Sequence, residues 1–108
     1  MRTRVKICGF TEVDTAVEAA KLGVDAIGLV FYEPSPRHVT IQQACHIAAA
    51  LPAFVSVVAL FVDADPGYIE QVLNAVAVDC IQFHGNESPE ACRRYNKRYI
   101  KAIRMQKD

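Results

Sequence analysis

The sequence predicts an α/β protein in which a parallel β-sheet is covered by amphipathic helices. Short apolar runs rich in β-branched residues alternate with stretches whose apolar residues recur at helical spacing. Each strand-and-helix unit takes roughly 20 to 30 residues, about the length that a βαβ unit needs. The strands are apolar along most of their length, as in parallel sheets. The order βαβαβαβαβ within residues 1–108 predicts a single domain or part of one.

The first strand is expected at residues 4–8, RVKIC. Thr11 has the position of a helix N-cap, and Asp14 three residues later completes a pattern that resembles a capping box. The helical repeat that follows should end at Gly23, because glycine commonly terminates helices. Residues 24–31, VDAIGLVF, are almost continuously apolar and predict the second strand.

The second helix begins with another capping-box pattern, in which Thr40 is the N-cap and Gln43 the reciprocal partner. Its apolar face continues until Pro52, which cannot extend a helix. Residues 54–62, FVSVVALFV, then predict a third buried strand.

Proline follows an N-cap residue at the start of both remaining helices. The pair Asp65–Pro66 opens the third helix, and residues 79–84, DCIQFH, predict the fourth strand. The pair Ser88–Pro89 opens a fourth helix that we expect to reach about Arg98. Residues 99–103, YIKAI, predict the fifth strand.

Two architectures fit this order: an open doubly wound sheet, or part of a (β/α)8 barrel. Along the first strand Val5 and Ile7 share one face, whereas Lys6 and Cys8 share the other. Residues 81–84, IQFH, alternate in the same way. A doubly wound sheet needs apolar side chains on both faces, but a barrel can carry polar ones inside. The alternation therefore favours a partial barrel of five parallel strands and four helices.

Composition excludes several classes of function. Lys plus Arg and Asp plus Glu both number 12, so no net charge favours binding to nucleic acid or to an anionic membrane. No apolar stretch is long enough to span a bilayer. The N-terminal residues MRTRVKICG lack the pattern of a signal peptide. We therefore expect a cytoplasmic protein.

The four cysteines, Cys8, Cys45, Cys80 and Cys92, are expected to be reduced in that compartment. Their spacing contains no C-x-x-C pair. Cys45 adjoins His46, but neighbouring residues on a helix point about 100° apart and chelate poorly. No metal site is therefore expected, and Cys45, Cys80 and Cys92 are interpreted as structural.

Cys8 has a different setting, because it ends a strand and precedes Gly9 and a helix start. A buried core cysteine is the ordinary interpretation of this residue type. Backbone N–H groups and the helix dipole at a strand-to-helix junction favour anions, however, and Lys6 lies on the same face. A reactive thiolate is therefore the alternative.

Two other residues follow predicted strands at the same edge of the sheet. Arg37 lies in the proline-stiffened loop at residues 33–39, EPSPRHV, where it is either solvated or a clamp for a carboxylate or phosphate. His84 ends the fourth strand and would share a mouth with Cys8. Asp63, just after the third strand, is interpreted as a helix-entry residue.

Taken together, these stretches resemble the phosphoribosylanthranilate isomerases of tryptophan biosynthesis. The resemblance runs from residue 4 to about 104, in the family's order and spacing, and the combination of KICG, SPR and QFHG is highly specific. The matching stretches are KICGFT, GVDAIGLVFYEPSPRHV, VALFVD, IQFHGNE and KAIR.

The resemblance implies a (β/α)8 barrel that works without a cofactor. Its reaction is an Amadori rearrangement, in which N-(5-phosphoribosyl)anthranilate becomes 1-(2-carboxyphenylamino)-1-deoxyribulose 5-phosphate. The resemblance implies that Cys8 is the general base and that Arg37 holds the carboxylate of the anthranilate. Lys6 and His84 would line the same mouth and contact the substrate.

The family's general acid is an aspartate at the end of the sixth strand, and its phosphate loops follow the seventh and eighth. The chain stops at Asp108, just after the fifth strand, and Asp108 is not assigned the acid's role. We therefore expect the chain to be inactive alone, with open edges that a C-terminal half or a second copy would cover. The alternatives are a non-catalytic, self-associating half-barrel and a different (β/α) phosphosugar enzyme.

Overall fold

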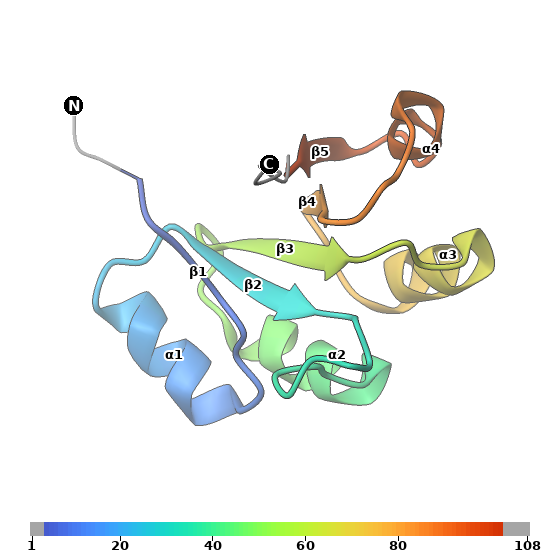
Figure 1. Cartoon of the computed structure of the whole chain (residues 1–108). Helices are drawn as coiled ribbons and strands as arrows, with labels where there is room; N and C mark the ends of the chain where they lie inside the picture. The colour runs from blue at the N-terminus through green and yellow to red at the C-terminus, as the bar shows by residue number, and fades with distance from the viewer. Residues whose placement is uncertain (1–3, 103–108) are drawn as a thin grey trace, which may run out of the picture.

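The computed structural model describes residues 4–102, and in this range strands and helices alternate from β1 to β5 (Figure 1). The five strands are β1 (Lys6–Cys8), β2 (Ala26–Val30), β3 (Ser56–Phe61), β4 (Cys80–Phe83) and β5 (Arg98–Lys101). The four helices are α1 (Val13–Lys21), α2 (Ile41–Ala50), α3 (Pro66–Ala75) and α4 (Pro89–Arg93).

The strands form one parallel sheet in the order β1-β2-β3-β4-β5, so neighbours in the sequence are neighbours in the sheet. A doubly wound sheet reverses its strand order at a switch point, and no reversal occurs between β1 and β5. The sheet is curved, and the helices lie around its outside (Figure 1). This is the arrangement of consecutive units in a (β/α)8 barrel, and the predicted five strands and four helices are confirmed.

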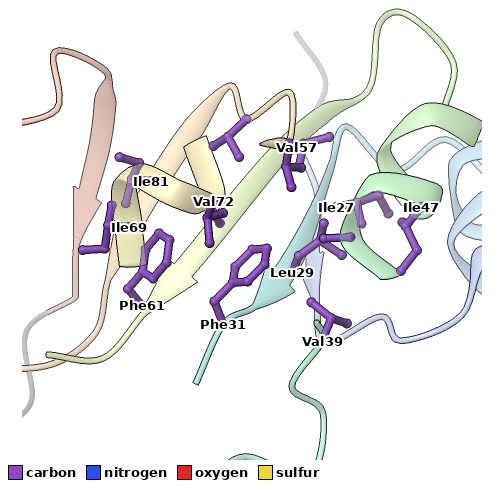
Figure 2. Packing of buried hydrophobic residues seen from close by; sticks show 14 of the residues in the cluster. Ile27, Leu29, Phe31, Val39, Ile47, Val57, Phe61, Ile69, Val72 and Ile81 are labelled. Carbon is purple, nitrogen blue, oxygen red and sulfur yellow. The ribbon is translucent and has the colours of Figure 1, made fainter. Parts of the chain in front are cut away.

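The hydrophobic core fills the space between the sheet and the helices (Figure 2). Alternate residues of β2, β3 and β4 supply its sheet side, so each of these strands turns one face to the helices. The rings of Phe31 and Phe61 stack there with centroids 5.5 Å apart. The fully buried members from the three strands are Ile27, Leu29, Ala59, Phe61, Ile81 and Phe83. Each large side chain of this set contributes about 1.5–3 kcal/mol by its removal from water.

Three helix starts form as the sequence predicts. The hydroxyl of Thr40 accepts a hydrogen bond from the N–H of Gln43 at 3.1 Å, and the Gln43 side chain accepts one from the N–H of Thr40 at 2.9 Å. Asp65 accepts from the N–H of Gly67 at 3.0 Å at the start of α3. Ser88 likewise accepts from a backbone N–H in the first turn of α4. These bonds satisfy donors that a helix terminus otherwise leaves unpaired.

The predicted capping box of Thr11 and Asp14 is wrong. The N-cap of α1 is Glu12, which has extended backbone angles and makes no side-chain cap hydrogen bond. Instead, the hydroxyl of Thr15 donates to the carbonyl of Glu12 at 3.1 Å. The predicted stop is confirmed, because α1 ends two residues before Gly23.

Helix α4 is shorter than predicted, since it ends at Arg93 and not near Arg98. The chain turns at Asn96, whose φ of 53° lies in the left-handed region that asparagine tolerates. The preceding residue, Tyr95, stacks on Phe83 with ring centroids 6.2 Å apart. Packing of Tyr95 against the core therefore replaces the last expected turns of the helix.

The two edge strands carry apolar side chains that are only half-covered. Val5 and Ile7 at β1 are each 43% exposed, and Tyr99 and Ile100 of β5 are 37% and 45% exposed. Residue 103, expected in the last strand, lies outside the described residues. None of the helices in residues 4–102 is long and apolar enough to cross a membrane.

Candidate active site

The carboxyl ends of the parallel strands bring the predicted residues to one edge of the sheet. Cys8 is the last residue of β1, and His84 directly follows β4. The backbone N–H of His84 continues the ladder by donating to the carbonyl of Phe61 at 2.9 Å. The common edge that the sequence predicts is therefore present.

Lys6, Cys8 and Gln82 meet on the face of the sheet that has no helices. The Nζ atom of Lys6 donates to the Sγ atom of Cys8 at 2.9 Å and to the Oε1 atom of Gln82 at 2.5 Å. Lys6 therefore bridges from β1 to β4. The predicted shared face of Lys6 and Cys8 is confirmed, because the Lys6 ammonium contacts the Cys8 sulfur directly.

Arg37 reaches back from the loop after β2 to the end of β1. Its Nη1 atom donates to the backbone carbonyl of Cys8 at 3.4 Å. The guanidinium lies so close to Gly9 that a Cβ atom there would stand 2.6 Å from Nη1. Gly9 also has a φ of 94°, so both its conformation and its space require glycine. Within residues 4–102 the Arg37 guanidinium pairs with no carboxylate, and its charge remains available to a ligand.

The loop that presents Arg37 is held in shape by its own hydrogen bonds. The hydroxyl of Ser35 accepts from the N–H of Arg37 at 3.1 Å, and the N–H of Ser35 donates to the carbonyl of Tyr32 at 2.9 Å. Val39 then rejoins the sheet through a 2.9 Å bond to the carbonyl of Val30. These hydrogen bonds hold the loop in one conformation and thereby fix the position of Arg37 relative to the end of β1.

His84 is half-buried at the mouth, and its Nδ1 atom is buried with no hydrogen-bond partner among the described residues. A buried ring nitrogen without a partner costs free energy in the unliganded protein. A ligand group at the mouth would recover part of that cost. The structure does not bring the His84 ring into contact with Cys8 through any described hydrogen bond.

The remaining cysteines have structural surroundings. Cys92 is 2% exposed in the core, and burial raises the pKa of its thiol. The Sγ atom of Cys45 donates to the carbonyl of Ala75 at 3.2 Å. Burial also raises the pKa of Cys80, and the nearby charge of Lys6 partly opposes that rise. No metal-binding group of three or more His, Cys, Asp or Glu side chains occurs in residues 4–102.

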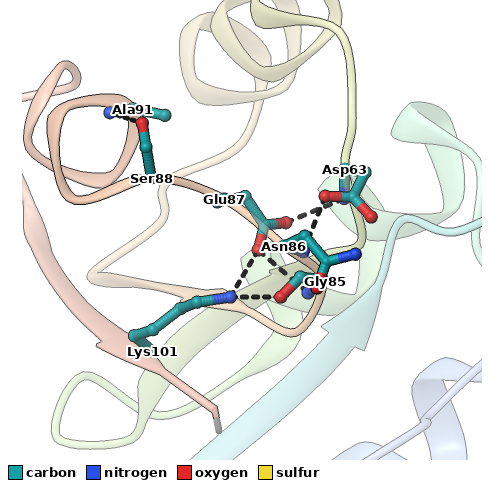
Figure 3. Close-up of polar contacts among 7 residues, drawn as sticks. All are labelled: Asp63, Gly85, Asn86, Glu87, Ser88, Ala91 and Lys101. Carbon is teal, nitrogen blue, oxygen red and sulfur yellow. Dashed lines mark hydrogen bonds and ion pairs between the residues drawn. The ribbon is translucent and has the colours of Figure 1, made fainter. Parts of the chain in front are cut away.

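A second polar cluster joins the ends of β3, β4 and β5 (Figure 3). The carboxylate of Glu87 accepts from the N–H of Asp63 at 2.7 Å, from the N–H of Gly85 at 2.9 Å and from Lys101 Nζ at 2.9 Å. The Asp63 carboxylate accepts from the N–H of Asn86 at 2.8 Å. The interpretation of Asp63 as a helix-entry residue is wrong, because it links two strand ends and has a φ of 48°.

The charge of Glu87 is stabilised despite burial. Its side chain is 8% exposed, and burial alone would raise its pKa. The hydrogen bonds from Lys101 and from the backbone of Asp63 and Gly85 outweigh this effect and hold the pKa of Glu87 below its usual value. These contacts of Asp63, Gly85, Asn86, Glu87 and Lys101 therefore fix the loop that begins at His84, and we call this cluster the charged latch.

Sequence reasoning did not assign a role to Gln82 or to Glu87. The signal for Gln82 was its position two residues before His84, on the same face of the strand. No comparable signal existed for Glu87, since its partners come from three different strand ends.

Comparison with known proteins identifies the family. A sequence model described as N-(5'-phosphoribosyl)anthranilate (PRA) isomerase matches residues 5–108. The chain belongs to this family. Curated family members include those of Halorhodospira halophila, 57% identical over 105 residues, and Nitrosococcus oceani, 58% identical over 105 residues.

Solved structures of this family have the same fold. Phosphoribosyl anthranilate isomerase from Thermotoga maritima superposes with a TM-score of 0.91 at 38% identity, over 94% of this chain and 51% of that one. A structure of the isomerase in complex with reduced 1-(o-carboxyphenylamino)-1-deoxyribulose 5-phosphate gives a TM-score of 0.90 at 38% identity, over 94% of this chain and 54% of that one.

The match covers 97% of this chain but only 51% of the Halorhodospira halophila and Nitrosococcus oceani proteins. The chain thus spans about half the length of the curated relatives that it matches. The half that it spans contains the Cys8 and Arg37 positions at the mouth of the partial barrel.

Proposed function

We propose that these residues form one partial-barrel domain that supplies the base-carrying half of a phosphoribosylanthranilate isomerase site. In this proposal Cys8 is the general base, Arg37 binds the anthranilate carboxylate, and Lys6 and His84 contact the substrate. The single observation that carries the proposal is the placement of Lys6 Nζ 2.9 Å from Cys8 Sγ, beneath an Arg37 that reaches the same residue. The site would work in the cytoplasm, without nucleic acid or a membrane as a partner.

The rearrangement requires one general base and one general acid. Protonation of the furanose ring oxygen breaks its bond to C1 and leaves a Schiff base between C1 and the anthranilate nitrogen. Removal of the C2 proton by the Cys8 thiolate then places that electron pair in a C1–C2 double bond. Protonation at C1 and loss of the C2 hydroxyl proton give the ketone, so the step is a net isomerisation. A thiolate suits this role because its basicity lies close to neutral pH.

The aromatic carboxylate of the substrate has a matching partner in Arg37. The guanidinium is held by the β2–α2 loop and is not neutralised by a carboxylate among residues 4–102. An arginine in a fixed position binds a carboxylate through two parallel hydrogen bonds and sets its orientation. Because Arg37 also touches the carbonyl of Cys8, the bound carboxylate would fix the substrate relative to the sulfur.

The proposal leaves the general acid and the phosphate site to the strands that the matched relatives have beyond this half. The test joins these 108 residues to the C-terminal half of the Halorhodospira halophila relative and follows the loss of phosphoribosylanthranilate by its fluorescence. We expect turnover by the joined chain and none by the 108 residues alone. Full turnover by the 108 residues alone would show that the acid and phosphate groups are assigned to the wrong half.

A second candidate function is a self-associating, non-catalytic half-barrel. The observation in its favour is the half-exposed apolar surface of both edge strands, at Val5, Ile7, Tyr99 and Ile100. Unpaired strand edges and apolar side chains are a template for pairing with another chain. The Thermotoga maritima relative is itself described as dimeric, which makes association between copies a reasonable alternative.

Sedimentation equilibrium of the wild-type chain and of an Ile7→Lys and Ile100→Lys double variant separates the two candidates. Pairing through the edges predicts a dimer that the double variant weakens, while Ala49→Lys on the exposed surface of α2 leaves it unchanged. A monomeric wild-type chain, or a dimer whose stability the Ile7→Lys and Ile100→Lys substitutions do not change, would exclude association through the edge strands.

A further inference from the structure

Among the described residues, Gln82 is the one residue besides Cys8 whose side chain accepts a hydrogen bond from Lys6. An ammonium group has three hydrogens, and here one points to Cys8 Sγ and another to Gln82 Oε1. Because an amide oxygen carries no charge, it orients the ammonium without neutralising it. A carboxylate at the same position would compete with the sulfur for the positive charge.

The hydrogen bond between Lys6 and Gln82 joins two residues that are far apart in the sequence. Lys6 lies on β1, whereas Gln82 lies on β4, 76 residues further along the chain. Gln82 is half-buried between the buried residues Ile81 and Phe83, so its backbone position is fixed by the core. Lys6, in contrast, is exposed and belongs to an edge strand of the described sheet. A lysine in such a place loses side-chain entropy when it is held in one rotamer, and the Gln82 contact offsets that loss.

The sulfur on the other side of the ammonium is fixed independently. Cys8 pairs with Gly28 across β1 and β2, and a Cβ atom at Gly28 would overlap the Sγ atom of Cys8. The N–H of Gly9 donates to the carbonyl of Gly28 at 3.0 Å and ties down the end of β1. With the sulfur seated over Gly28, the position of the Lys6 ammonium decides how strongly the thiolate is stabilised.

From this geometry we propose that Gln82 is a positioning residue, which acts through Lys6 to keep the Cys8 sulfur in its thiolate form. The inference rests on the proposed function, in which Cys8 is the base, but it concerns the reactivity of the thiol itself. Arg37 is the other cation near Cys8, and it contacts the backbone carbonyl and not the sulfur. Arg37 is present in every variant described below, so its effect on the reactivity of Cys8 is the same in all of them.

The test is the rate at which iodoacetamide alkylates Cys8 at pH 7, since the thiolate is the reacting form. Trypsin places Cys8 in a peptide of its own, residues 7–21, or residues 5–21 where Lys6 is replaced by Met. Cys45, Cys80 and Cys92 share residues 38–93, so mass spectrometry follows Cys8 alone. We expect Gln82→Met to slow the alkylation about five-fold, in line with the loss of one charge-assisted interaction. The matched control Gln71→Met, an exposed glutamine of α3, should leave the rate unchanged.

The dependence on Lys6 distinguishes positioning from a local structural effect. In a Lys6→Met background, Gln82→Met should cause no further loss, because the group through which it acts is gone. Thermal unfolding followed by circular dichroism reports the fold of every variant, and Gln82→Asn replaces Gln82→Met if that protein does not fold. Equal alkylation rates in the wild type and the Gln82 variant, or the same loss with and without Lys6, would overturn the inference.

Failure of this inference and failure of the proposed function are separate results. The alkylation rate needs no turnover, so it tests Gln82 even if the chain catalyses no isomerisation. Conversely, normal turnover by a joined chain with Cys8→Ala would rule out Cys8 as the base, and the alkylation result for Gln82 in the chain that retains Cys8 would still stand.

Discussion

The carbonyl of Cys8 accepts a hydrogen bond from the Arg37 guanidinium at 3.4 Å, although 29 residues separate the two in the chain. The contact brings the loop after β2 over the end of β1 and places a cation beside the residue whose sulfur faces Lys6. One strand end therefore carries both a group that can accept a proton and a group that can orient an anionic substrate.

Arg37→Met in the joined chain should raise KM for phosphoribosylanthranilate about 10- to 100-fold, because a hydrogen bond to a charged group contributes about 1.5–3 kcal/mol. The fall in kcat should be smaller, since the base and acid remain in place. Arg93→Met, at an exposed position of α4, is the matched control. An unchanged KM in the Arg37 variant would mean that the carboxylate binds elsewhere.

Gly28→Ala should destabilise the chain by about 1–3 kcal/mol, because the new methyl group overlaps the sulfur of Cys8 in a packed strand pair. Urea unfolding measures the effect. Adding Cys8→Ala removes the overlapping sulfur, so the double variant should recover part of the lost stability. A Gly28→Ala protein as stable as the wild type would show that the Cys8 sulfur packs less tightly against residue 28 than the structure indicates.

Glu87→Gln should lower the free energy of unfolding by about 1–3 kcal/mol at pH 7, because it removes the charge that Lys101 and two backbone N–H groups stabilise. Glu70→Gln, an exposed position on α3, is the matched control. Thermal unfolding measures both changes. If Glu87→Gln and Glu70→Gln lowered the stability equally, the hydrogen bonds and ion pair of Glu87 would add nothing to the effect of removing one surface charge.

The same carboxylate predicts how stability depends on pH. Folding lowers the pKa of Glu87 from its ordinary value of about 4.5, so its contribution is fully present above that value. The contribution is lost as the pH falls through the lower pKa of the folded state. The difference in stability between the wild type and Glu87→Gln should therefore be constant near neutral pH and shrink on acidification below about 4.5. A difference that persists to strongly acidic pH would contradict a charge-based latch.

The sequence predicts the order and the facing of the elements because both follow from local patterns. The alternation in IQFH places Ile81 and Phe83 toward the helices, and both are buried in the core. The capping box of Thr40 and Gln43 forms because both partners lie within one helical turn. The predicted cap at Thr11 fails since the backbone of Glu12 already has the N-cap conformation.

The features that the sequence does not predict depend on contacts between distant segments. The end of α4 depends on the packing of Tyr95 against Phe83, which no local periodicity reports. The bridge from Lys6 to Gln82 depends on the curvature of the sheet across several strands. Residue type and position identify Cys8, Arg37 and His84 as candidates, whereas the group that orients Lys6 is visible only once the strands are assembled.

The proposed role of Cys8 as the general base is tested most directly by two cysteine substitutions in the joined chain. Cys8→Ala should lower kcat by at least about 100-fold, which is the lower range of general acid–base contributions, while the fold is retained. Cys80→Ala, at a half-buried cysteine that also lies near Lys6, should leave kcat within a few-fold of the parent. A Cys8→Ala protein with the turnover of the Cys80→Ala control would contradict the assignment of the base.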